Sequence, residues 1–460
     1  MRLVVSFSRK QRWRLGMSGR FLGKQFTTFQ IIIAGFLAVI LAGAFLLTLP
    51  VSSTAGCRTS FADALFTAAS AVCVTGLVVK DTALYWSYFG QAVILVLIQI
   101  GGLGIITVTA LIASVSGRKI TLLQRSVLQE SISANQLGGV VKLTTFICKV
   151  ALATELLGAL LMMPAFCSTF GVSGIWMSFF HSVSAFCNAG FDVMGGHTGE
   201  FSSLTFFSAS FGVVIPVCML IIVGGIGFLT WDDISRNKLR FRTYSMQSKV
   251  IITATAVLIM LPSAVFFFND FSGFGLKERL LFSLFQAVTP RTAGFNTVDM
   301  SSLSSAGRAM TVVLMLVGGA PGSTAGGVKI TTAAVLLANA SAVVRHRKNS
   351  RLFCRRIDED TVKSASTLMI LYLMLALAGA FIISVSEGLS FDACIFETAS
   401  AIGTVGLSMG ITPQLGLISR AVLVSLMFFG RVGGLTLLYA AVNPGRVETA
   451  RYPVERINVG

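Results

Sequence analysis

Four short glycine-containing segments recur along this 460-residue chain, and their shared pattern is suited to binding a cation. In each segment a glycine stands directly before a bulky apolar residue, and the glycines lie at positions 76, 190, 294 and 406. Glycine readily adopts a backbone φ above zero, which an extended loop needs if successive carbonyl oxygens are to point toward one axis. Four such loops around an axis would replace the water shell of a monovalent cation with carbonyl oxygens.

The residues expected to bind the cation are the glycine and its neighbours in each loop, and this is the only metal site that the sequence predicts. They are Val74, Thr75, Gly76, Leu77, Asn188, Ala189, Gly190, Phe191, Thr292, Ala293, Gly294, Phe295, Thr404, Val405, Gly406 and Leu407.

The spacing of the loops indicates a repeated structural unit. The glycines are separated by 114, 104 and 112 residues. Six residues before each glycine stands Ser70, Ser184, Val288 or Ser400. One Ala-Gly-Phe alone would merely indicate the end of a helix. Four in register favour a short helix that ends at each loop, where its partially negative C-terminus would also attract a cation.

A second glycine pattern follows each loop. Close helix packing explains the glycines at 101–104 and 224–227, since small residues let helices approach. The segment 318–327 contains too many helix breakers to stay helical, so we expect an interruption in mid-membrane that acts as a gate. The expected gate residues are Gly318, Gly319, Gly322, Ser323, Thr324, Gly326, Gly327 and Arg431.

Two cations lie at a comparable depth. Arg431 stands within an apolar run, where charge is costly, and just inside the loops it would oppose the passage of a cation. The alternative is an arginine that packs between helices and pairs with carbonyl groups or an acid. Lys329 is expected to extend toward the cytoplasmic face.

Other charged residues permit plainer interpretations. Arg291 is expected to brace its loop by pairing with a carboxylate. Glu155 and Lys149 share one apolar span and are expected to pair with each other or across helices. Four acids near the expected outer mouth either concentrate cations or serve as ordinary capping and solvated residues. They are Asp63, Asp192, Asp299 and Asp392.

The elements that must position these residues lie in lipid. Apolar residues make up 54% of the chain and charged residues 12%, and several stretches exceed the roughly 20 apolar residues that cross a bilayer. The first span is too long for a signal peptide. The net charge of +17 needs no nucleic-acid partner, because the basic residues gather in alternate loops. Five basic segments predict eight crossings, with both termini in the cytoplasm.

The predicted fold is therefore an all-α integral membrane protein with four tandem helix–pore loop–helix repeats around one central pore. It has eight transmembrane helices and four re-entrant half-helices, since irregular backbone at membrane depth survives only where it is buried or lines a cavity. The predicted divisions are a cytoplasmic N-terminus (1–28), repeats at 29–117, 140–232, 248–345 and 361–443, and a cytoplasmic tail (444–460).

Two other classes of function fit less well. A secondary transporter for a small organic solute would have inverted repeats, whereas repeats of two crossings each share one orientation. An enzyme would need convergent acids, bases or metal ligands, and three scattered histidines and eight cysteines without a CxxC pair offer none. We therefore expect no enzymatic activity and no organic cofactor.

The four loops, the 318–327 segment and Arg431 resemble the Trk/Ktr/HKT superfamily of cation transporters, and most closely its KtrB-type membrane subunits. The resemblance covers nearly the whole chain. It implies uptake of K⁺, commonly dependent on Na⁺, across the bacterial cytoplasmic membrane. It also implies a homodimer, in which the tail at 451–460 packs at the interface, and a cytoplasmic nucleotide-binding (RCK-type) regulatory subunit. All four loops keep glycine, the pattern that the resemblance associates with K⁺ selectivity.

The coupling ion stays open at this point. Coupling to Na⁺, coupling to H⁺, a passive pore and a less selective Na⁺/K⁺ transporter of the same superfamily are all compatible with the residues. The chain has no G-x-x-x-x-G-K-[ST] segment of its own, so any nucleotide would bind to the partner.

Overall fold

The computed structural model describes residues 19–455 apart from 22–23, 27, 106, 109–127, 130–138, 239, 435 and 437–454. Most of the basic N-terminus, most of the basic segment at 118–142 and nearly all of the tail lie outside the described residues. The α-helices are α2 (Thr28–Leu47), α3 (Phe61–Val72), α4 (Thr82–Tyr85), α5 (Tyr88–Leu103), α8 (Val140–Phe170), α9 (Ser173–Phe186), α10 (Gly195–Thr198), α11 (Phe211–Gly225), α12 (Phe228–Asn237), α13 (Met246–Phe268), α14 (Leu276–Val288), α15 (Ser305–Met315), α16 (Ile330–Val344), α17 (Glu359–Glu387), α18 (Phe391–Gly403) and α19 (Leu417–Val432).

The protein is an all-helical membrane protein with two minor hairpins. β1 (Gly19–Phe21) pairs with β2 (Lys24–Phe26), and β3 (Arg351–Leu352) pairs with β4 (Arg355–Arg356). Within the described residues, α2, α8, α13 and α17 are long and apolar enough to cross a bilayer, and α11 with α12, bent by 97°, makes a fifth if the pair is counted as one span. Shorter apolar helices include α3, α5, α15 and α16. The eight crossings stay a prediction.

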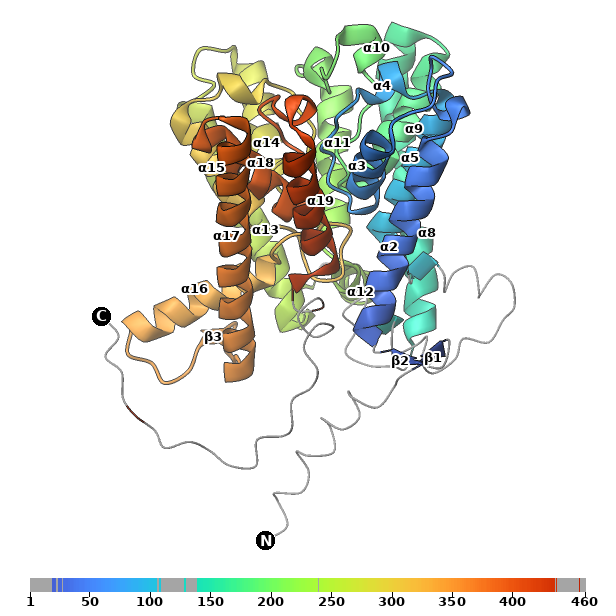
Figure 1. Ribbon diagram of the computed structural model, residues 1–460. Helices are drawn as coiled ribbons and strands as arrows, with labels where there is room; N and C mark the ends of the chain where they lie inside the picture. The colour runs from blue at the N-terminus through green and yellow to red at the C-terminus, as the bar shows by residue number, and fades with distance from the viewer. Residues whose placement is uncertain are drawn as a thin grey trace.

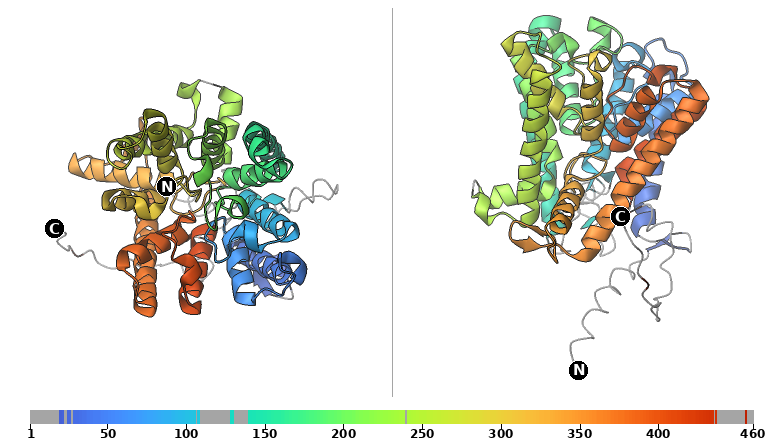
Figure 2. Two further views of the ribbon diagram at one scale, coloured as in Figure 1. Left: turned by 90° about the horizontal axis from the view of Figure 1, so that it is seen from above. Right: turned by 90° about the vertical axis from the view of Figure 1, so that its left-hand side faces the viewer.

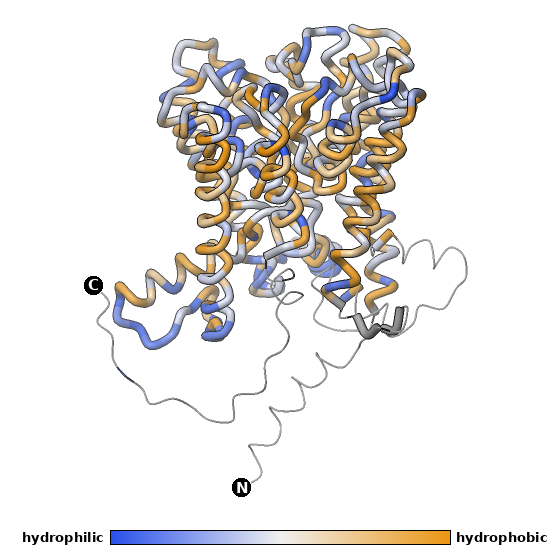
Figure 3. The backbone as a smooth tube through the Cα atoms, viewed as in Figure 1, coloured by the Kyte–Doolittle hydropathy of each residue, from blue (hydrophilic) through white to orange (hydrophobic). Residues whose placement is uncertain are grey.

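The surface of the long helices is suited to lipid. Phe45, Leu152, Met260 and Phe381 are between 60% and 73% exposed on α2, α8, α13 and α17. Apolar residues cover the middle of the molecule and polar residues gather at its two ends (Figure 3). Such extensive exposed apolar surface requires an apolar solvent.

Twelve of the described helices form four groups of three. In each group a long helix (α2, α8, α13 or α17) packs against the short helix that follows it (α3, α9, α14 or α18). The next helix of the group (α5, α11, α15 or α19) contacts the same short helix. We call these three sets the long, short and following helices. The long helices stand along the molecule (Figure 1), and the groups follow one another around its middle when seen from above (Figure 2).

The groups close into a circle. The following helix of each group also contacts the short helix of the next group, in the pairs α5 with α9, α11 with α14, α15 with α18, and α19 with α3. The last pair joins the end of the described chain to its beginning. The four short helices are thereby held around one centre.

Local sequence sets where these helices begin and end. Ser60 and Ser390 cap α3 and α18 by accepting hydrogen bonds from backbone N–H groups of the first turn. At the other end of a following helix, Gly227 has a φ of +89°, and the chain there bends by 97° from α11 into α12. α5 likewise ends at Gly104, with a φ of +86°. Helix breaks therefore occur in the first two groups as well as the third, which the packing interpretation missed.

Close packing at these glycine clusters is also present. A methyl group on Gly101 would lie 2.1 Å from the carbonyl oxygen of Val72, and one on Gly224 would lie 2.0 Å from that of Phe186. The following helices thus touch the C-terminal ends of the short helices, a distance that only glycine permits.

Candidate cation pathway

Each short helix ends directly before one glycine loop. We call residues 74–77, 188–191, 292–295 and 404–407 the glycine loops. The helices α3, α9, α14 and α18 end at 72, 186, 288 and 403. The negative end of each helix dipole consequently lies beside a loop, which favours a positive charge there.

The backbone of all four loops follows the same conformation. The glycines have φ values of +90°, +69°, +80° and +94° in chain order. Two residues earlier, Val74, Asn188, Thr292 and Thr404 also have positive φ, between +51° and +69°. For a residue with a side chain this conformation costs roughly 1–3 kcal/mol and is typical of functional sites. The sequence predicted the glycine conformation but not that of the second position.

Hydroxyl side chains hold the loops in this conformation. Ser70 Oγ accepts a hydrogen bond of 3.1 Å from the backbone N–H of Gly76, and Ser400 Oγ accepts one of 2.9 Å from that of Gly406. Ser184 instead donates to the carbonyl oxygen of Phe191 at 2.7 Å.

In the third loop the hydroxyl comes from Thr289, which donates to the carbonyl oxygen of Phe295 at 2.7 Å. Counting six residues back from Gly294 singled out Val288, which has no polar side chain, so that alignment was wrong by one residue. The carbonyl of Thr289 also accepts from the backbone N–H groups of Ala293 and Gly294.

The loops lie against one another in a ring. A methyl group on Gly76 would lie 2.5 Å from the carbonyl oxygen of Ala189 in the second loop. Similar approaches join the second loop to the third, the third to the fourth, and the fourth back to the first. The pairs are Gly190 with Ala293, Gly294 with Val405, and Gly406 with Thr75, at 2.7, 2.2 and 2.1 Å.

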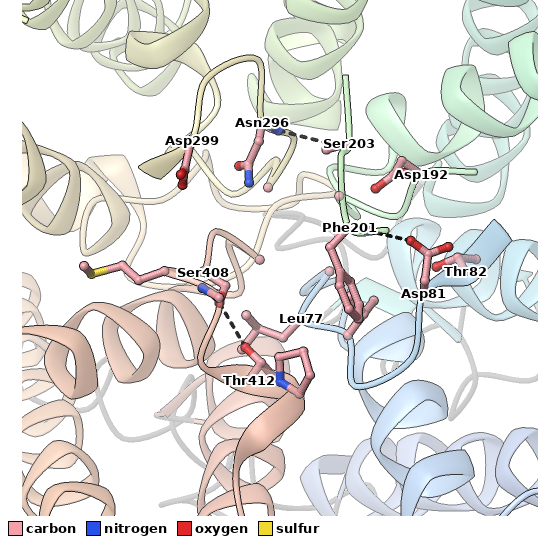
Figure 4. A pocket seen from close by; sticks show the side chains of 18 of the residues that line it. Leu77, Asp81, Thr82, Asp192, Phe201, Ser203, Asn296, Asp299, Ser408 and Thr412 are labelled. Atoms are coloured by element: carbon pink, nitrogen blue, oxygen red, sulfur yellow. Dashed lines mark hydrogen bonds between the residues drawn. The ribbon is translucent and has the colours of Figure 1, made fainter. Parts of the chain in front are cut away.

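A cavity of about 330 Å³ lies against the ring, and its lining includes Thr82 at the start of α4, a helix at the upper end of the molecule in Figure 1. All four loop glycines contribute to its lining, together with the carboxylates of Asp81, Asp192 and Asp299 (Figure 4). Of the four acids that the sequence singled out, Asp192 and Asp299 line this mouth. Asp63 and Asp392 instead pair with arginines.

Asp81 was not predicted from the sequence as an acid of the mouth. Its position five residues after a loop glycine, the same as that of Asp299, could have indicated it. Its Oδ1 accepts from the backbone of Ala83 and Leu84, and its Oδ2 accepts from that of Phe201 at 2.8 Å. Burial, with the Asp81 carboxylate nearby, raises the pKa of Asp192 to about 7, although its hydrogen bond from the backbone of Met194 lowers it. Asp192 is half-buried in the cavity wall.

Below the ring, residues 316–329 form a loop between α15 and α16, so the interruption predicted within 318–327 is present. This loop touches the underside of the glycine loops. Thr324 Oγ1 donates to the carbonyl oxygen of Phe186 at 3.1 Å, and a methyl group on Gly326 would lie 2.2 Å from Thr404 Oγ1. The predicted gate residues of this segment thus lie directly beneath the predicted binding residues.

Arg431, near the end of α19, ties this loop to the first group. Its guanidinium donates to the carbonyl oxygens of Thr324 and Gly101, and to that of Gly102 at 3.0 Å. No carboxylate pairs with it among the described residues. Hydrogen bonds from this half-buried side chain to backbone carbonyls agree with an arginine that packs between helices, and its role as a barrier stays a prediction.

Two expectations for other charged residues were wrong. Lys329 does not extend to the cytoplasmic face, because its Nζ donates to the carbonyl oxygen of Ala325 in its own loop at 2.8 Å. Arg291 bonds to the hydroxyl of Thr255 at 3.1 Å and to no carboxylate in the described part of the chain. A neutral hydroxyl suffices to orient it without adding a second buried charge.

Glu155 does not pair with Lys149, whose side chain is exposed. Its carboxylate accepts two hydrogen bonds from Gln99 Nε2 on α5, at 2.9 and 3.2 Å. The alternative expectation of a contact across helices is therefore confirmed. Within the described residues, no group of three or more His, Cys, Asp or Glu side chains could hold a metal ion.

Comparison with known proteins gives a consistent family. The model of the TrkH family, described as a cation transport protein, matches residues 24–446. The "Potassium/sodium uptake protein NtpJ" of Enterococcus hirae is 40% identical over 95% of this chain and 98% of its own length. The "Ktr system potassium uptake protein B" of Bacillus subtilis is 37% identical over 95% of this chain and 97% of its own.

A solved structure supports the same architecture. The crystal structure of the potassium transporter TrkH from Vibrio parahaemolyticus superposes with a TM-score of 0.74, at 17% sequence identity. The alignment covers 95% of this chain and 89% of that one. At this identity the likeness concerns the fold alone.

Proposed function

This chain belongs to the TrkH family of cation transport proteins, and we propose that it takes up K⁺ through a single pore formed by its four glycine loops. The observation that carries the proposal is the closed ring, in which each loop glycine lies against the carbonyl of the next loop. Two relatives with nearly full-length alignments are named as potassium or potassium/sodium uptake proteins. Family membership also agrees with the expectation of a transport protein rather than an enzyme.

In this mechanism the loop carbonyls take the place of the water around K⁺. We expect the carbonyl groups of the residues before and at each glycine to face a common axis, in loops whose backbone is held by the hydroxyls of Ser70, Ser184, Thr289 and Ser400. The C-terminal ends of the four short helices add negative potential. The acids of the mouth raise the local concentration of cations before they enter.

The barrier lies beneath the ring. Arg431 holds the 316–329 loop against α5 through backbone carbonyls, and this places a positive charge on the pathway below the loops. Conduction requires this loop and the guanidinium to move aside. The bonds to neutral carbonyls, rather than to a carboxylate, make that movement less costly.

For the topology in the membrane and the assembly of subunits, we keep the predictions made from the sequence. We propose four tandem repeats with eight crossings in the bacterial cytoplasmic membrane, both termini in the cytoplasm, and the divisions given above. Relatives named as parts of a Ktr system support a multi-subunit assembly. We propose a homodimer and a cytoplasmic nucleotide-binding (RCK-type) regulatory subunit, in agreement with the resemblance.

Na⁺ enters as a second candidate ion. The relative from Enterococcus hirae is named for both potassium and sodium uptake, which favours either Na⁺-dependent K⁺ uptake or a less selective Na⁺/K⁺ pathway. The two are separated by competition. In the first case Na⁺ stimulates uptake of K⁺, and in the second it competes with it.

The test is ⁸⁶Rb⁺ uptake into proteoliposomes that contain the purified chain, with and without Na⁺. Unlabelled K⁺ should suppress uptake far more strongly than Na⁺ at the same concentration. Uptake that K⁺ does not suppress, or no uptake by either the natural chain or Arg431→Ala, would contradict the proposed function.

A further inference from the structure

The following helices carry a repeated polar position that joins neighbouring groups. Gln91, Arg308 and Arg420 are each the fourth residue of α5, α15 and α19. Each side chain donates a hydrogen bond to a backbone carbonyl in the segment just before its own helix. The acceptors are Trp86, Leu303 and Pro413, at 3.0, 2.8 and 3.0 Å. Each also reaches the short helix of the next group.

The partners on the next short helix differ in chemistry but share a place in its first turns. Trp176 Nε1 of α9 donates to Gln91 Oε1 at 2.8 Å, and Asp392 of α18 lies 3.4 Å from Arg308 Nε. Asp63 of α3 accepts a bond of 2.7 Å from Arg420 Nη1. At the remaining junction α11 has no such side chain, and Lys277 of α14 lies over the ring of Phe211, 5.1 Å from its centre.

The junction between the fourth and first groups differs from the other three. Consecutive groups are joined by the chain itself, whereas Arg420 and Asp63 are 357 residues apart. Only non-covalent contacts hold α19 against α3. Of the two Arg–Asp pairs at the junctions, Arg420 with Asp63 is the shorter. Its side chains are 23% and 16% exposed, whereas Asp392 in the other pair is 66% exposed.

The contact between Arg420 and Asp63 is connected to both the first and the fourth glycine loop. Asp63 stands in the first turn of α3, which leads directly into the first loop. Arg420 bonds in addition to the carbonyl of Pro413, a residue of the mouth wall that follows the fourth loop. The first and fourth loops touch through Gly406 and Thr75.

We propose that Arg420 and Asp63 form a positioning clamp that closes the ring, and that the clamp sets the discrimination between K⁺ and Na⁺. By holding α3 beside the fourth loop, the pair fixes the separation of the carbonyls of loops one and four. Loss of either partner lets the contact between loops one and four widen or shift. The ring then discriminates less well against Na⁺, which is smaller and more strongly hydrated than K⁺. The proposal rests on the proposed pore.

The experiment compares Asp63→Asn, Arg420→Gln, the double variant and Arg420→Lys in the ⁸⁶Rb⁺ competition assay. The measured quantity is the ratio of Na⁺ to K⁺ concentrations that halve uptake. Each single neutral variant should lower this ratio about fivefold, and the double variant should lower it no further, because the partners act together. Arg420→Lys keeps the charge and should retain part of the discrimination.

The control is Asp232→Asn, which removes an exposed pair within one helix, with Arg236, and should leave the ratio unchanged. Thermal unfolding of each variant is measured in parallel. An unchanged ratio in both single variants, or changes that add in the double variant, would overturn the clamp. If the natural chain takes up no ⁸⁶Rb⁺, the proposed function fails, and non-additive melting temperatures at 63 and 420 then still report whether the contact closes the ring.

Discussion

Replacing Gly76 by serine is the most direct test of the ring of glycine loops. The substitution adds a side chain where the backbone φ is +90° and where a Cβ atom would lie 2.5 Å from the carbonyl oxygen of Ala189. Two separate costs follow: strain in the backbone of the first loop, and displacement of a carbonyl that we assign to K⁺ binding.

The two costs have different sizes and different consequences. A residue with a Cβ pays about 1–2 kcal/mol in a left-handed conformation. In addition, the Ala189 carbonyl must retreat by about 0.5 Å, because contacts of Cβ atoms shorter than 3.0 Å essentially do not occur. If the shift removes about 1.4 kcal/mol from binding of K⁺, the preference for K⁺ over Na⁺ falls about tenfold.

Gly56 provides a matched control. Its φ is +66°, and a Cβ atom there would meet no atom within 4 Å. Gly56→Ser therefore has similar backbone strain without the displaced carbonyl. Both variants should lose thermal stability through backbone strain, Gly76→Ser somewhat more because of the displaced carbonyl, while only Gly76→Ser should lower the ratio of Na⁺ to K⁺ concentrations that halve ⁸⁶Rb⁺ uptake. An unchanged ratio in Gly76→Ser, or an equal fall in both variants, would refute the assignment of this carbonyl.

The remaining predictions concern the barrier and the mouth. Arg431→Ala removes the charge beneath the ring and should raise the rate of ⁸⁶Rb⁺ uptake about tenfold; an unchanged rate would exclude Arg431 as the barrier. Deletion of 322–326 should raise the rate as well, and a slower pore would show that this loop supports the ring rather than blocking it. Because burial raises the pKa of Asp192 to about 7, its carboxyl gains a proton as the pH falls from about 8 to about 6. The mouth then loses a negative charge, so the ⁸⁶Rb⁺ concentration for half-maximal uptake should rise, and in Asp192→Asn it should no longer respond to pH in this window.

The sequence predicted those features that depend on backbone freedom. Glycine at 76, 190, 294 and 406 marked the loops because few other residues adopt their φ, and the structure has positive φ at all four. The break within 318–327 was visible for the same reason. That the glycine loops bind an ion, and that the 318–327 segment acts as a gate, stay predictions.

Features that depend on packing between distant segments could not be predicted. The partner of Glu155 is Gln99, which ordinary spacing rules do not connect. Positive φ at Val74 and Thr404 could not be predicted either, because neither residue type favours that conformation. The closing pair of Arg420 and Asp63 was likewise hidden, since neither residue carries a sign of the other.

The closure of the ring also bears on how the protein is made. Besides α2 and α5 of its own group, α3 contacts α19, so the first short helix is synthesised long before the last of its neighbours. A chain that ends between the fourth glycine loop and α19 already has all four loops but lacks the helix that closes the ring against α3. We therefore expect a chain that stops before α19 to lack the contact between the first and fourth loops, and with it a closed cation pathway.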